Sequence, residues 1–305
     1  MITAKNLTKK FEDVTALSNL NCTIPDGCIY GLVGANGAGK STFLRLASGI
    51  YQPDEGEITI NGGKVFDNPS VKKQFVFVPD ELFFLPQSNM KRMAQLYQSA
   101  YERFSIQRFN ALTEQFRLDP TKSFSTFSKG MRRQAATILA LSTMAEYVFF
   151  DETFDGLDPI MRNLVKQALY QDVVDRKCTA VITSHSLREL EDTCDQLALL
   201  YQGGVVFESD VQNLKTSLFK LQVAFDTPFD QSKFEQLNVL SFNKQGSVAN
   251  LIVRGGREEC RQQVAAMSPL LLEVLPLTLE EVFVYEMEAL GYVFDEPAMA
   301  KGEVS

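Results

Sequence analysis

The chain has 305 residues, of which 45% are hydrophobic and 22% charged, a composition typical of globular proteins and not of disordered or fibrous ones. Its 30 basic and 38 acidic residues give a net charge of −8, which argues against a large nucleic-acid-binding surface. No apolar run approaches the roughly 18 residues needed to cross a bilayer, and residues 1–14 lack the apolar segment of a secretory signal. The five cysteines form no CxxC pair, so we expect buried thiols in a reducing cytoplasm.

The N-terminal part of the sequence predicts strands, a loop and then helices. Residues 1–30 are β-rich, and the apolar segment 29–33 leads through glycines into a helix. In residues 88–118, Met, Leu, Tyr and Phe recur at helical spacing. This stretch is expected to form a helical insertion between sheet strands.

Helices and strands then alternate until about residue 201. A helix from Ser128 to about Met144 precedes the strand at 147–150, and further helices separate the strands at 178–184 and 196–201. Such alternation predicts an α/β fold with a largely parallel sheet covered by helices on both faces. Residues 216–305 change to short strands and two helices, which predicts a separate small α+β domain.

The segment "GANGAGKS" (Gly34–Ser41) matches GxxxxGK[ST] at every fixed position. Its glycines let backbone N–H groups face a phosphate at a helix N-terminus, although a tight strand-to-helix turn is the alternative. Lys40 is expected to contact the β- and γ-phosphates, and the Ser41 hydroxyl is expected to bind Mg²⁺. The residues expected to bind phosphate here are Gly34, Asn36, Gly37, Ala38, Gly39, Lys40, Ser41 and Thr42.

Two carboxylates end the apolar strand at 147–150. In a parallel sheet the carboxyl ends of strands face the crevice where ligands bind. Asp151 therefore fits a Mg²⁺ ligand acting through water, and Glu152 fits the general base that activates the attacking water. The alternative is a solvated pair of charges at a strand end.

The single histidine, His185, follows the next apolar strand. Gly34, Asp151 with Glu152, and His185 thus follow three strands that are expected to end at one edge of the sheet. There His185 would hydrogen-bond a γ-phosphate and help to hold Glu152 and the water. An ordinary packed or surface histidine is the alternative.

These motifs resemble those of the nucleotide-binding subunits of ABC transporters, over residues 1 to about 210. Residues 34–42 resemble the Walker A motif, 147–152 the Walker B motif, 156–159 ("GLDP") the D-loop, and His185 the switch histidine. The resemblance implies a P-loop NTPase fold with an ABC-type ATPase domain at 1–212, whose helical subdomain covers about 82–145. An accessory domain at 216–305 would be dimerising or regulatory.

The segment "TFSKGMRRQ" lies where this family places its signature sequence. Ser128 and Gly130 are retained, whereas Lys129 and Met131 depart from the usual residues, as in the ATPases of bacterial ABC-2-type exporters. The resemblance implies that Ser128 and Gly130 contact the γ-phosphate of ATP bound by a second copy. Ser128 also fits an ordinary helix N-cap.

Two further positions follow from the resemblance. Asp80 occupies the place of a family glutamine, and its carboxylate would reach Mg²⁺ through water. Phe11 lies where the family stacks an aromatic ring on adenine, although packing is the alternative for a single Phe in a strand. The expected cofactors are ATP and Mg²⁺.

The resemblance also implies partners. Two copies, or this chain and a similar ATPase, would bind two ATP molecules head to tail and drive a separate transmembrane permease. The chain would lie at the inner face of the membrane through the permease, and export is favoured. The apolar residues 82–85 fit either a groove for a permease helix or the core.

Two other functions are alternatives for this sequence. A non-transport ABC ATPase acting on nucleic acid or ribosomes is disfavoured by the acidic charge, the lack of a coiled-coil insertion and the single cassette; no nucleic-acid partner is expected. A small-molecule kinase would not need Glu152, the signature segment or His185.

Overall fold

The computed structural model describes residues 1–154, 156–289 and 291. It divides into two compact units, Met1–Ser209 and a second that begins at Asp210. The boundary suggested by the sequence, between 212 and 216, falls inside a helix at Val211–Ser217. The two units are described separately.

The first unit contains two sheets. An antiparallel sheet has the strand order β2-β1-β4-β5, and a six-stranded sheet has the order β10-β9-β3-β8-β7-β6. The strands are β1 (Ile2–Phe11), β2 (Val14–Ile24), β3 (Ile29–Val33), β4 (Glu55–Ile60), β5 (Gly63–Lys64), β6 (Phe75–Val78), β7 (Tyr147–Asp151), β8 (Thr179–Ser184), β9 (Gln196–Tyr201) and β10 (Gly204–Asp210). The sequence had not indicated β10.

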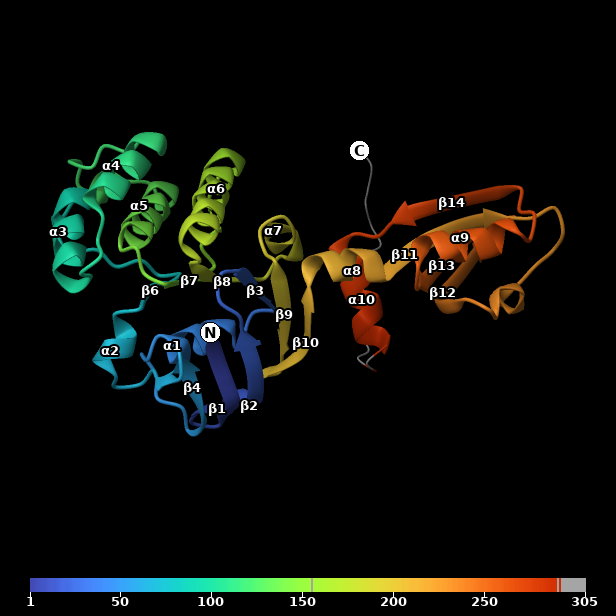
Figure 1. The fold of residues 1–305 in the computed structure, drawn as a ribbon, viewed down its shortest axis with the longest axis horizontal. Coiled ribbons are helices and arrows are strands. Elements are labelled where there is room, and N and C mark those ends of the chain that lie inside the picture. Colours follow the sequence, from blue (N-terminus) through green and yellow to red (C-terminus); the bar gives the residue numbers. More distant parts are fainter. Residues whose placement is uncertain (155, 290, 292–305) are drawn as a thin grey trace. The chain divides into compact units, whose positions relative to one another are not determined.

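Helices cover both faces of the six-stranded sheet. They are α1 (Lys40–Ala47), α2 (Pro69–Lys72), α3 (Met90–Ala100), α4 (Ile106–Gln115), α5 (Lys129–Ser142), α6 (Pro159–Arg176) and α7 (Leu187–Glu191). In Figure 1, α3, α4, α5 and α6 lie on one side of this sheet, and α1 and the antiparallel sheet lie on the other.

The burial of the strands explains these layers. Every residue of β3, β7 and β8 is buried, as expected for parallel strands that are covered on both faces. Phe43 and Leu44 of α1 join the core formed with Leu32 and Phe149. The central strands are therefore enclosed, and only their ends are free to carry polar groups.

Each of the three main helices of the helical insertion begins at a side chain that caps its N-terminus. Asn89, Ser105 and Ser128 cap α3, α4 and α5, each accepting a hydrogen bond from a backbone N–H of the first turn. Such caps stabilise a helix by about 1 kcal/mol. An ion pair between Arg108 and buried Asp172, at 2.9 Å, joins α4 to α6.

The second unit has its own antiparallel sheet, with strand order β12-β13-β11-β14. Its elements are α8 (Val211–Ser217), β11 (Leu218–Ala224), β12 (Asn238–Gln245), β13 (Val248–Arg254), α9 (Arg257–Ala265), β14 (Leu271–Pro276) and α10 (Leu279–Ala289), with a short 3₁₀ turn at Gln231–Phe234. Alternate residues of β11 and β13 pack with Cys260 and Val264 of α9 in a separate core. The strands and helices expected after residue 216 are present, and α8 had not been predicted.

Among the residues that the structure describes, no helix has the length and apolar character needed to span a membrane.

The buried cysteines give a test of the fold. Burial raises the pKa of the Cys22, Cys28 and Cys178 thiols to about 12, and the thiolate is the reactive form. We expect the native chain at pH 8 to resist alkylation by iodoacetamide at these three thiols. The same thiols should react rapidly in guanidinium chloride, as measured by mass spectrometry of peptides. Rapid labelling of the native protein at Cys178 would contradict the packing of β8.

Candidate functional site

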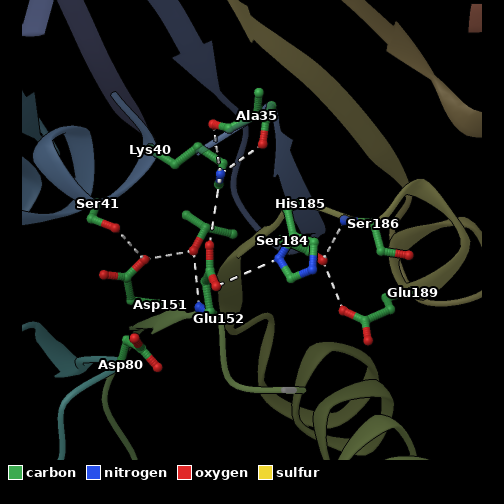
Figure 2. Close-up of polar contacts among 12 residues, drawn as sticks. Ala35, Lys40, Ser41, Asp80, Asp151, Glu152, Ser184, His185, Ser186 and Glu189 are labelled. Atoms are coloured by element: carbon green, nitrogen blue, oxygen red, sulfur yellow. Dashed lines mark hydrogen bonds and ion pairs between the residues drawn. The ribbon is translucent and has the colours of Figure 1, made fainter. Parts of the chain in front are cut away.

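The candidate site lies at the carboxyl edge of the six-stranded sheet. β3, β8 and β7 are adjacent and parallel, with Val33 opposite Ser184 and Thr183 opposite Asp151. The loops that follow these strands therefore meet at one edge, as the order of elements predicted. Figure 2 shows their polar side chains converging.

The loop from Gly34 to Gly39 is held tightly against its surroundings. Gly39, just before α1, has a φ of 107°, and a Cβ there would lie 2.7 Å from the Ala16 carbonyl oxygen. A Cβ on Gly34 would lie 2.5 Å from the Leu200 carbonyl oxygen. Both positions therefore require glycine, the first for its backbone conformation as well. The intervening turn, with Asn36 and Gly37, is exposed.

Lys40 places a positive charge inside this loop. Its side chain is only 4% exposed, and Nζ donates to the carbonyl oxygens of Gly34, at 2.6 Å, and Ala35, at 3.2 Å. The Nζ atom also lies 3.7 Å from Oε1 of Glu152. A buried ammonium needs such partners, since its desolvation is costly. The lysine is thus oriented toward the strand ends (Figure 2).

Asp151 is buried beside the start of α1. Its Oδ1 accepts hydrogen bonds from Ser41 Oγ, at 3.0 Å, and from Thr183 Oγ1, at 2.7 Å. Its Oδ2 is buried and has no hydrogen-bond partner within the described part of the chain. An orphaned carboxylate oxygen next to a hydroxyl fits a Mg²⁺ site, because Mg²⁺ prefers oxygen ligands and uses one or two carboxylates together with phosphates and water.

The Glu152 carboxylate lies between two basic side chains. Besides Oε1 near Lys40, its Oε2 lies 3.6 Å from Nδ1 of His185. The Glu152 backbone has a φ of 48°, an uncommon conformation for a residue with a side chain. Its N–H donates to Thr183 Oγ1 at 3.0 Å. Thr183 therefore bridges both carboxylate residues, a role that the sequence had not indicated.

The position of His185 is set by the polar residues around it. Ser184 Oγ, directly before it, donates to Glu189 Oε2 at 2.8 Å and accepts from the Ser186 N–H at 3.0 Å. Glu189 also pairs with Arg162 of α6 at 3.1 Å. These contacts, partly visible in Figure 2, fix the end of β8 and the start of α7. In the sequence, the polar residues Thr183 and Ser184 at the end of an apolar strand were the feature that indicated such contacts.

Asp80 has a different partner from the one predicted. Its Oδ1 lies 2.7 Å from Nη2 of Arg133, whose side chain is 1% exposed. The carboxylate is thus the counter-ion of a buried arginine. The Mg²⁺ role suggested for Asp80 stays a prediction, and this pairing does not favour it.

The other predicted residues lie on separate elements. Ser128 caps α5 by accepting from the Met131 N–H at 3.2 Å, so the N-cap alternative is present. Gly130 adjoins the turn after β7, because a Cβ there would lie 3.1 Å from the Gly156 carbonyl oxygen. The roles of Ser128 and Gly130 on ATP of a second copy stay predictions.

Phe11 at the end of β1 is partly exposed. The residue is 38% exposed, and its ring packs edge-on against that of Tyr51, with centroids 5.2 Å apart. The geometry leaves both packing and adenine stacking open, so the stacking role stays a prediction.

The chain is similar to known ATP-binding proteins. Residues 17–155 match the family model for the ABC transporter. The chain is 29% identical over 284 residues to the ABC transporter ATP-binding protein YtrB of Bacillus subtilis, covering 93% of this chain and 97% of that protein. It is 28% identical to the daunorubicin/doxorubicin resistance ATP-binding protein DrrA of Streptomyces peucetius, covering 79% and 74% respectively.

The fold is also similar to that of a solved structure. A solved ATP-binding subunit of an ABC transporter superposes with a TM-score of 0.66 at 24% identity, covering 70% of this chain and 92% of that one. The chain is also 30% identical over 207 residues to the ABC transporter ATP-binding protein YybJ of Bacillus subtilis, covering 90% of that protein. It belongs to the ABC transporter family of ATP-binding proteins. It is an ATP-binding subunit of such a transporter.

The bridging role of Thr183 can be tested with Thr183→Val, which keeps the shape and removes the hydroxyl. Asp151 and the Glu152 N–H then lose a buried partner, so we expect the free energy of unfolding to fall by about 1–3 kcal/mol. The rate of ATP hydrolysis should fall as well. The measurements are urea denaturation and phosphate release.

Thr113→Val is the matched control, because buried Thr113 donates only to a backbone carbonyl within α4. It should leave the rate of hydrolysis unchanged. Equal rates for Thr183→Val and the wild type would contradict the bridging role.

Proposed function

We propose that the chain hydrolyses ATP at the edge formed by β3, β7 and β8 and drives export through a separate membrane permease. One observation carries the site: Lys40 and His185 approach the two oxygens of the Glu152 carboxylate from either side, at 3.7 and 3.6 Å. This arrangement fits a base held between a phosphate-binding lysine and a histidine.

The residues have distinct roles in this mechanism. The backbone N–H groups of the Gly34–Gly39 loop and Lys40 would bind the β- and γ-phosphates of ATP. Glu152 would accept a proton from the attacking water. At the same time the water oxygen would bond to the γ-phosphorus, and the bond between the γ-phosphorus and the ADP oxygen would break. His185 would orient the water and the γ-phosphate. Mg²⁺, held by Ser41 and Asp151, would neutralise phosphate charge.

A second copy would complete each site. The first turn of α5 holds no acidic residue, so the positive end of the helix is not offset there. Ser128 and Gly130 at this end would contact the γ-phosphate bound by the partner. The pair would be a homodimer or a heterodimer with a similar ATPase.

An apolar groove supports a permease partner. Residues 82–88 line it together with Ser123, Phe124, Ser125 and Arg132. Phe84 stacks on Phe124, with centroids 3.8 Å apart, whereas Phe83 is 78% exposed. Such a surface suits an apolar helix of a membrane protein. Docking there would hold the chain at the inner face of the membrane.

Similarity to DrrA, whose name records drug resistance, favours export by this chain too. YtrB is named as an ABC transporter protein, which favours the transporter over an ATPase acting on nucleic acid. We infer that the second unit is an accessory domain, dimerising or regulatory, since it packs its own core around β11 and β13.

Glu152→Gln tests the general base. The amide keeps the size of the side chain and cannot accept the proton, so we expect hydrolysis to fall by about 10²–10⁴-fold. ATP should still bind, and the variant should form a dimer with ATP, as measured by sedimentation. Hydrolysis at close to the normal rate would rule out Glu152 as the base.

Lys40→Ala and His185→Ala separate binding from hydrolysis. Loss of charge-assisted hydrogen bonds from Lys40 should weaken ATP affinity by about tenfold or more. His185→Ala should instead lower the rate of hydrolysis more than the affinity. Equilibrium binding of a fluorescent ATP analogue and phosphate release measure the two effects. Unchanged affinity in Lys40→Ala would count against the phosphate-binding loop.

A further inference from the structure

Arg133 is a buried charge that the proposed mechanism does not use. It lies in α5, just beyond Ser128 and Gly130. Among the described residues, it has the largest side chain that is fully buried. A buried guanidinium is destabilising unless its donors are satisfied. Here Nη2 pairs with Asp80, and Nη1 donates to the backbone carbonyl oxygen of Glu152 at 2.5 Å. The Nε atom is buried without a hydrogen-bond partner among the described residues.

These two contacts join two neighbouring loops. Asp80 follows β6 and Glu152 follows β7, and the two strands are parallel neighbours with Val78 opposite Phe150. The segment after Asp80 continues into residues 82–88, which line the apolar groove. Arg133 of α5 therefore connects Asp80, which precedes the segment lining the groove, to Glu152, the proposed general base.

The contact at Glu152 bears on the position of its carboxylate. The left-handed backbone of this residue is held at its N–H by Thr183 and at its carbonyl by Arg133. Such a conformation persists only where surrounding contacts hold it. Loss of either contact allows the peptide to rotate, which moves the carboxylate relative to Lys40 and His185.

We propose that Arg133 is a positioning residue that links the Asp80 segment to Glu152, with Asp80 as its counter-ion. The proposal rests on the role of Glu152 as general base. A partner that displaces the segment after Asp80 would change the hold of Arg133 on the Glu152 carbonyl, and so the rate of hydrolysis. Asp80 would act through Arg133 and not as a Mg²⁺ ligand.

The chain offers a matched control of the same chemistry. Arg108 pairs with Asp172, which is 6% exposed at its side chain, and joins α4 to α6. A purely structural role for Arg133 would resemble this pair. Arg108→Lys should lower stability and leave kcat unchanged.

Arg133→Lys keeps the charge but not the planar fork that contacts two oxygens at once. In the full chain we expect kcat to fall about tenfold, with KM for ATP within about twofold of the wild type. Thermal unfolding and ATP binding show that the variant is folded. A wild-type kcat in folded Arg133→Lys would overturn the proposal.

Asp80→Asn tests the counter-ion. We expect a lower kcat with an unchanged Mg²⁺ concentration for half-maximal activity. The double variant Asp80→Asn/Arg133→Lys should show no further loss beyond Arg133→Lys, because the two residues act as a unit. A raised Mg²⁺ requirement in Asp80→Asn, or multiplicative losses in the double variant, would overturn the assignment of Asp80.

Glu152→Gln, measured in the same assay, separates this proposal from the one on which it rests. Normal hydrolysis by Glu152→Gln means that the general-base assignment has failed, whatever Arg133 does. An inactive Glu152→Gln together with a normal Arg133→Lys means that only the positioning role has failed.

Discussion

The site depends on the parallel register of β3, β8 and β7. This register sets Val33 beside Ser184 and Thr183 beside Asp151, so that three loops meet at one edge. Because side chains alternate along a strand, a slip of one residue would turn Thr183 away from Asp151. The apolar strands enclosed between helix layers fix the register, and the polar groups at the strand ends follow from it.

Burial gives the charges at this edge their effect. Lys40 is 4% and Asp151 1% exposed, so their interactions are less weakened by solvent than those at the surface. Each is oriented by fixed partners: two backbone carbonyls hold Lys40, and two hydroxyls hold Asp151. The two hydroxyls thus position Asp151 before the reaction begins.

Local patterns in the sequence were sufficient to predict the loop from Gly34 to Ser41, the alternation of strands and helices, and the common edge of the three strands. The contacts of Arg133 with Asp80 and Glu152, and the bridge made by Thr183, were missed, because they join residues far apart in the chain. β10 was also missed, since none of its residues is fully buried and they lack a strong alternating pattern.

A structure of the full chain with Mg²⁺ and a non-hydrolysable ATP analogue tests the central claim most directly. We expect Lys40 Nζ to exchange the carbonyl oxygens of Gly34 and Ala35 for oxygens of the β- and γ-phosphates, with His185 facing the γ-phosphate. A triphosphate bound elsewhere, with Lys40 still on both carbonyls, would contradict the assignment of this edge as the site of ATP hydrolysis.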